Sequence, residues 1–130
     1  MGGKRNLPRL SETQMALMDI VWRKGEATVT EVWKALPRGR RGARTTIMTL
    51  MARLAKKGWL RRRKVGNEYV YSPTIGRKKA LGDVLSRLTE IAFSGSVESM
   101  VMSLVDARGI SKEEAEHLRR IIDEFVEGRR

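Results

Sequence analysis

The sequence predicts a mainly α-helical chain: a winged helix-turn-helix, with three helices and a two- or three-stranded β wing, followed by a helical dimerisation arm. Three observations lead to this fold class. Apolar residues recur at helical spacing in three successive segments, a basic β-hairpin follows them, and three further amphipathic helices end the chain. With 130 residues and no cysteine, the chain has room for one domain and a short appendage, without disulfide bonds or thiolate metal sites.

The first three helices have recognisable ends. Ser11 begins a capping box and opens the first helix, and Thr28 or Thr30 opens a short second helix, which Pro37 ends. A glycine-punctuated basic loop leads to the third helix, which we expect from about residue 43 to 57. Its inward stripe consists of Ile47, Leu50, Met51 and Leu54.

A β-hairpin follows the third helix. Residues 59–65 and 68–72 read as two strands around a Gly66-Asn67 turn, and we expect Tyr69 and Tyr71 to pack rather than to stack on bases. We assign the three tryptophans, Trp22, Trp33 and Trp59, to the core or its rim. Residues 1–75 therefore form the predicted winged-helix domain.

Residues 76–130 form the predicted dimerisation domain. Three short amphipathic helices follow one another here, the last opened by a Ser111–Glu114 capping box. Helices of this length without a sheet bury too little apolar surface to fold alone, so we expect each chain to cover the apolar stripes of a second copy. The candidate dimerisation residues are Leu81, Leu85, Leu88, Met100, Leu104, Leu118, Ile122 and Phe125.

The charge is high and unevenly placed. The net charge is +12, and no Asp or Glu occurs between Val32 and Asn67, whereas this stretch is rich in lysine and arginine. A solvated surface normally mixes both signs, whereas a polyanion partner favours one sign because neutralised phosphates release counterions. The placement of the charge therefore predicts double-stranded DNA as the partner.

The third helix and the hairpin carry the predicted DNA contacts. A recognition helix presents its N-terminal half to base edges, and threonine and arginine can both bind them. Cations further along the helix and in the wing are better placed for phosphates. The candidate DNA-binding residues are Arg44, Thr45, Thr46, Thr49, Arg53, Lys56, Arg62, Arg63 and Lys64, of which Thr45 is also a candidate helix cap.

The sequence offers little for catalysis. The single histidine, His117, stands among charged residues and reads as a solvated helix residue, and no nucleophile triad or phosphate-binding glycine loop is present. We therefore expect no enzyme activity, no cofactor and no metal. No apolar run is long enough to span a bilayer and the first residues do not resemble a secretory signal, which predicts a cytoplasmic protein without membrane insertion.

Two alternatives remain open from the residues alone. An architectural protein would use the same basic face for phosphates without sequence preference. A protein-binding adaptor would use the helical tail for a partner while the winged helix only packs.

The chain resembles the penicillinase-repressor (BlaI/MecI) family, which includes copper-responsive CopY relatives. The resemblance is carried by LSETQMALMDIVWRKGEATVTEVWKAL and TTIMTLMARLAKKGWLRRRKVGNEYVYSP, and it is good over residues 9–75; residues 76–127 agree mainly in layout. It implies a homodimeric repressor on a near-palindromic operator, with Thr46, Thr49 and Arg53 at DNA-facing positions of the family.

The resemblance also bears on how the repressor would be released. In the β-lactam branch, it implies an upstream membrane sensor that triggers proteolysis at an Asn-Phe pair, where this chain has Ser103-Leu104. In the copper branch, a cysteine motif binds the metal, and this chain has no cysteine.

Overall fold

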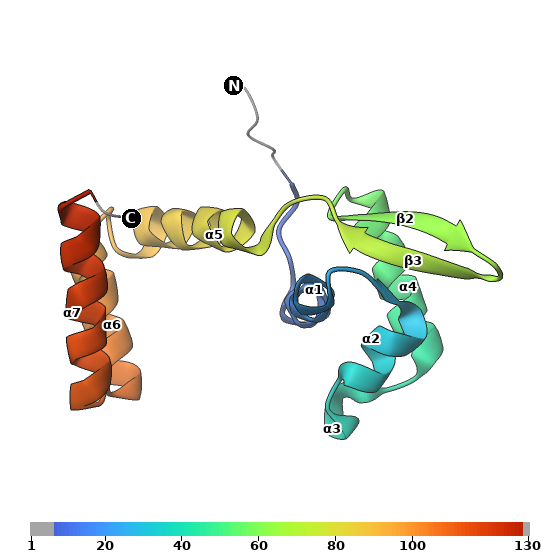
Figure 1. Cartoon of the computed structure of the whole chain (residues 1–130), viewed down its shortest axis with the longest axis horizontal. Coiled ribbons are helices and arrows are strands. Elements are labelled where there is room, and N and C mark those ends of the chain that lie inside the picture. Colours follow the sequence, from blue (N-terminus) through green and yellow to red (C-terminus); the bar gives the residue numbers. More distant parts are fainter. Residues whose placement is uncertain (1–6, 129–130) are drawn as a thin grey trace. The chain divides into compact units, whose positions relative to one another are not determined.

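The computed structural model describes residues 7–128. Their contacts divide into two compact units, the first ending at Gly82 and the second beginning at Asp83. The division falls within one helix, α5 (Arg77–Ala92), whose residues up to Gly82 belong to the first unit. Figure 1 shows the order of the elements along the chain. The predicted domain boundary at residues 75/76 stays a prediction.

The first unit is a winged helix-turn-helix, which confirms the predicted fold class. Ser11 and Thr28 each form a complete capping box, with Gln14 and Glu31, so Thr28 rather than Thr30 opens the second helix. The basic loop contains one helical turn that the sequence did not predict. The elements before α5 are α1 (Glu12–Lys24), β1 (Ala27–Thr28), α2 (Val29–Ala35), α3 (Arg38–Arg41), α4 (Arg44–Lys56), β2 (Leu60–Val65) and β3 (Glu68–Pro73).

The wing is a three-stranded antiparallel sheet in the order β1-β3-β2. Its hairpin pairs Val65 with Glu68 across the two-residue turn, where Gly66 has a φ of 63°. Glycine permits this positive φ, and hairpins with glycine at the first central position use it. Because β1 pairs Ala27 with Tyr71, the sheet is anchored to the start of α2.

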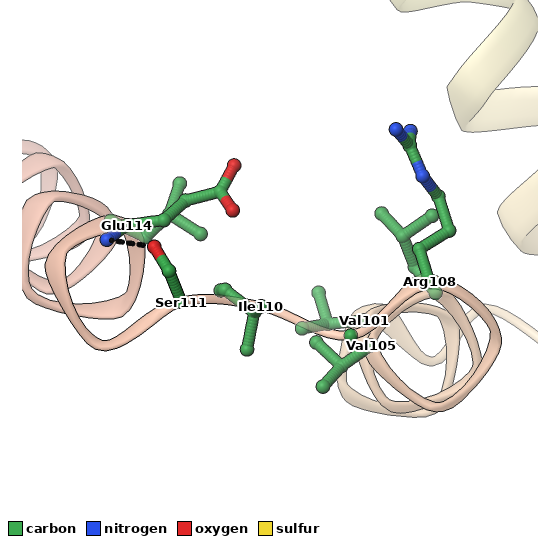
Figure 2. Close-up of a pocket in the computed structure, with 9 residues that line it drawn as sticks. Val101, Val105, Arg108, Ile110, Ser111 and Glu114 are labelled. Carbon is green, nitrogen blue, oxygen red and sulfur yellow. Dashed lines mark hydrogen bonds between the residues drawn. The ribbon is translucent and has the colours of Figure 1, made fainter.

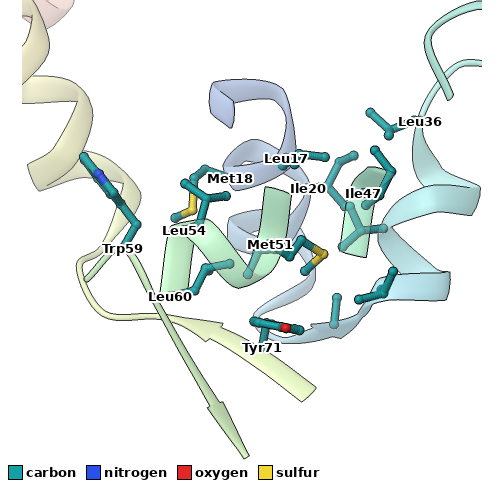
Figure 3. Packing of buried hydrophobic residues seen from close by; sticks show 14 of the residues in the cluster. Leu17, Met18, Ile20, Leu36, Ile47, Met51, Leu54, Trp59, Leu60 and Tyr71 are labelled. Carbon is teal, nitrogen blue, oxygen red and sulfur yellow. The ribbon is translucent and has the colours of Figure 1, made fainter. Parts of the chain in front are cut away.

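The core of the first unit lies between α1, α4 and the sheet (Figure 3). The predicted stripe of α4 is confirmed: Ile47, Met51 and Leu54 are buried, and Leu50 is half-buried. Burial of each large side chain stabilises the fold by about 1.5–3 kcal/mol. Other buried members of this core are Leu17, Met18, Ile20, Leu36, Trp59, Leu60 and Tyr71.

The three tryptophans lie in the core or at its rim, as predicted, and each indole N–H donates to a distant carbonyl. The acceptors are the carbonyl oxygens of Ile75, Gly42 and Pro8, at 2.9, 3.0 and 2.8 Å for Trp22, Trp33 and Trp59 respectively. These bonds satisfy the polar edge of a large apolar side chain. They also fix segments that neighbour the core.

The second unit contains the rest of α5, α6 (Val97–Arg108) and α7 (Lys112–Val126). Ser96 and Ser111 cap α6 and α7, but the structure records only half of the predicted Ser111–Glu114 box, the bond from the Glu114 N–H to the Ser111 hydroxyl. None of the described residues from Asp83 to Gly128 is buried. This unit therefore has amphipathic helices without a core of its own.

No single helix in the described part of the chain is long and apolar enough to cross a membrane. The pair α5 and α6 meets the length and composition criteria only together, as two helices bent by 97°.

Candidate nucleic-acid interface

The outer face of α4 exposes every helix residue that the sequence singled out. The buried stripe turns toward α1 and the sheet, so the opposite side is free for a ligand. Met48 is 45% exposed as well. The sequence analysis did not name it as a candidate, although its position outside the buried stripe of α4 predicts an exposed side chain. The exposed candidates on this helix are Arg44, Thr45, Thr46, Thr49, Arg53 and Lys56.

The N-terminus of α4 carries no side-chain cap. Ala43 occupies the N-cap position, so the prediction that Thr45 serves as a cap is wrong. The first turn also lacks acidic residues. The first N–H groups of a helix have no partner within it and carry partial positive charge, which favours an anion near this end.

The hydroxyl of Thr49 is partly committed within the helix. Its Oγ1 donates to the carbonyl oxygen of Thr45 at 3.1 Å. The methyl group and both lone pairs of the Thr49 hydroxyl stay available. This side chain can therefore contact a thymine methyl, or accept from the amino group of adenine or cytosine.

The wing cations lie on two opposite faces of the hairpin. The register pairs Arg62 with Tyr71 and Lys64 with Tyr69, whereas Arg63 pairs with Val70. Directly opposed residues share a face and neighbours along a strand alternate. Arg62 and Lys64 therefore lie on the tyrosine face, and Arg63 lies on the other.

Arg62 rests on the two tyrosines of its face. Its guanidinium carbon is 4.2 Å from the ring centroid of Tyr69, and its Nη1 donates to the Tyr71 hydroxyl at 3.4 Å, which raises the pKa of Arg62. Tyr71 is buried as expected, but Tyr69 is 41% exposed. Tyr69 therefore supports a cation rather than the core.

Arg63 is held by a carboxylate that precedes β1. Its Nη1 and Nη2 donate to Oε1 and Oε2 of Glu26 at 2.9 and 3.3 Å. These hydrogen bonds, with the attraction of the two charges, lower the pKa of Glu26, so its carboxylate is ionised at neutral pH. Sequence reasoning missed this pair because the partners are 37 residues apart.

We expect Glu26→Gln to strengthen DNA binding by about two- to fivefold per half-site, since exposed ion pairs contribute little. The substitution removes a negative charge and frees Arg63 for a phosphate, so the salt dependence should also become steeper. Fluorescence anisotropy at several salt concentrations measures both effects. Glu12→Gln, at an exposed position of α1, is the matched control. Weaker binding by Glu26→Gln would show that Arg63 needs the Glu26 carboxylate to face DNA.

The predicted dimerisation residues divide between the two units. Leu81 belongs to the first unit, where it is half-buried and lines a shallow hollow with Met15 and Trp22. Met100 is half-buried in the second unit. The other six are exposed: Leu85, Leu88, Leu104, Leu118, Ile122 and Phe125.

An apolar groove runs between α6 and α7 within the second unit (Figure 2). Arg108 and Glu114 add charged groups to its lining. Where the connection between the helices meets α7, the Glu114 N–H donates a hydrogen bond to the Ser111 hydroxyl at 3.0 Å and caps the helix. The apolar lining consists of Val101, Leu104, Val105, Ile110 and Leu118.

Metal-binding side chains do not gather in the part of the chain that the structure describes: it holds no group of three or more His, Cys, Asp or Glu residues arranged for a metal ion. His117 is exposed on α7.

The family model and the related sequences agree on one family. The family model described as penicillinase repressor matches residues 10–124. The chain is 28% identical to the penicillinase repressor of Bacillus licheniformis, over 92% of this chain and 94% of that protein. It is 34% identical to the transcriptional regulator BlaI of Mycobacterium tuberculosis, over 94% of this chain and 88% of that protein. A solved structure of the DNA-binding domain of the repressor BlaI aligns with a TM-score of 0.50 and 31% identity, covering 57% of this chain and 90% of that domain.

Proposed function

This chain belongs to the penicillinase repressor family of DNA-binding transcriptional repressors, and we propose that it acts in the cytoplasm as a homodimer on a near-palindromic operator. One observation carries the proposal. The first unit exposes a face of hydroxyl and cationic side chains on α4 next to an arginine-bearing hairpin, in a segment without carboxylates from Val32 to Asn67.

In this proposal α4 enters the major groove. Its N-terminal half, with Arg44, Thr46 and Thr49, reaches the base edges. Arg53 and Lys56 stand further along the same exposed face and contact phosphates. The wing, with Arg62 and Lys64 on one face and Arg63 on the other, binds the sugar-phosphate backbone.

The second unit supplies the dimer contact. Because no described residue from Asp83 to Gly128 is buried, its apolar faces remain in water in a single chain. Exposed apolar patches of this kind mark protein interfaces. A second copy covers them, and the two recognition helices then meet half-sites about one helical turn apart.

The family resemblance implies release by proteolysis at an Asn-Phe pair. This chain has Ser103-Leu104 at that position, within α6. An upstream membrane sensor rests on the family resemblance alone.

Competition binding tests the proposed function. The protein is first used to select the fragments of the source genome that it binds. These duplexes should then compete for the protein better than random duplexes by about 10³-fold or more. Equal competition would favour the architectural alternative, and a monomer by light scattering would favour the adaptor.

Two substitutions test the role of α4. Thr49→Ala and Arg53→Ala should each weaken binding to the selected duplex by about 1–3 kcal/mol, and the melting temperature should not change. Thr13→Ala, at an exposed threonine of α1, is the control. If both α4 variants bind like the parent, another element reads the DNA.

A further inference from the structure

The one-turn helix α3 presents two arginines and turns a third back onto the protein. Arg38 and Arg40 are exposed. Arg41 is half-buried: its Nη2 donates to the carbonyl oxygens of Lys34 and Leu36 at 3.0 and 3.3 Å, which satisfies the C-terminal end of α2. Three neighbouring cations of one short segment therefore have two different roles.

Stacking and hydrogen bonds around Trp33 fix this turn between α2 and α4. The guanidinium carbon of Arg41 lies 4.9 Å from the centroid of the Trp33 ring, whose N–H donates to the Gly42 carbonyl. Arg44, the first residue of α4, donates from Nε to Oγ1 of Thr30 at 2.8 Å. The turn is therefore tied to α2, and the start of α4 is tied to α2 as well.

Gly42 completes the turn with a backbone conformation that other residues avoid. Its φ of 59° and ψ of −156° lie at the edge of a region that is essentially restricted to glycine. The segment is thus ordered before it meets a ligand, which reduces the entropy cost of binding.

Among the residues that the structure describes, the exposed arginines of α3 have no carboxylate partner. The ion pairs of the described residues involve Arg23, Arg63 and Arg77, and the surrounding sequence is free of acids from Val32 to Asn67. Gly42 and Ala43 alone separate α3 from the start of α4 (Figure 1). Two unpaired guanidinium groups on an ordered turn, directly before the recognition helix, match the phosphates that border the groove.

We propose that α3 is an additional phosphate-binding element, in which Arg38 and Arg40 contact the DNA backbone beside the N-terminus of α4. This inference rests on the proposed function. The contacts add affinity and position α4 without reading sequence, because phosphates are the same at every base pair. Sequence analysis did not include these two residues among its candidates.

The double variant Arg38→Ala/Arg40→Ala tests the proposal through the salt dependence of binding. The slope of log K against log salt should become less steep by about 3.6 per dimer, since each of four phosphates contributes about 0.9. The preference for the selected duplex over random duplex should not change. Arg119→Ala/Arg120→Ala, at exposed positions of α7, makes the same change in net charge and should leave the slope unchanged.

A charge-conserving variant and the parent protein distinguish failure of the α3 proposal from failure of the proposed function. Arg38→Lys/Arg40→Lys should retain most of the slope, because a point charge suffices for a phosphate. A double alanine variant with the parental slope, or one that loses sequence preference instead, overturns the proposal. If the parent itself shows a flat slope or no preferred duplex, the proposed function fails, which is a different result.

Discussion

Raising the salt concentration from 50 to 200 mM is expected to weaken operator binding by about 10³- to 10⁵-fold, the range for a protein that makes six to ten phosphate contacts. Four exposed cations of α4 and the wing in each protomer, Arg53, Lys56, Arg62 and Lys64, give about eight such contacts in a dimer. The proposed contacts of Arg38 and Arg40 would add four, so this loss of affinity is the minimum expected. Each contact releases condensed counterions, and added salt opposes that release.

A titration of labelled duplex at several salt concentrations measures this dependence. Thermal unfolding at the same concentrations is the control, because salt must not unfold the protein over this range. A loss of affinity below tenfold would mean that the basic face does not meet phosphates, and it would contradict the placement of α4 and the wing on DNA.

Placing a charge in the apolar face of α7 is expected to separate the dimer. Ile122 is 59% exposed in the single chain and is predicted to be covered by the second copy. Ile122→Asp buries a carboxylate at that contact, which is strongly unfavourable. Loss of the second DNA-binding unit should lower operator affinity by about 10²- to 10⁴-fold, since the two half-sites no longer bind as one ligand.

Sedimentation and half-site binding distinguish this effect from misfolding. Ile122→Asp should sediment as a monomer and bind a single half-site like the parent, because the first unit has its own core. His117→Asp, on the polar side of α7, introduces the same carboxylate and should stay dimeric. A dimeric Ile122→Asp protein would show that α7 does not form the contact.

Local patterns predicted most of the fold. The helical spacing of Ile47, Met51 and Leu54 identified the buried side of α4, because burial repeats with the period of the helix. The Gly66-Asn67 pair identified the hairpin, because glycine allows the backbone of a tight turn. Predictions of helix N-caps were weaker where more than one residue could occupy the cap position. Thr28 rather than Thr30 caps α2, and Ala43 rather than Thr45 stands at the N-cap of α4.

The sequence by itself determined the order of the longer helices and the hairpin, the exposed face of α4 and the long segment without carboxylates. Tertiary structure alone decided which of the many cations are free to meet DNA. Arg41 is bound to the end of α2 and Arg63 pairs with Glu26, whereas Arg62 stays exposed on the ring of Tyr69. The physical reason is that charge is a property of each residue, whereas its neutralisation depends on groups that only folding brings within hydrogen-bond distance.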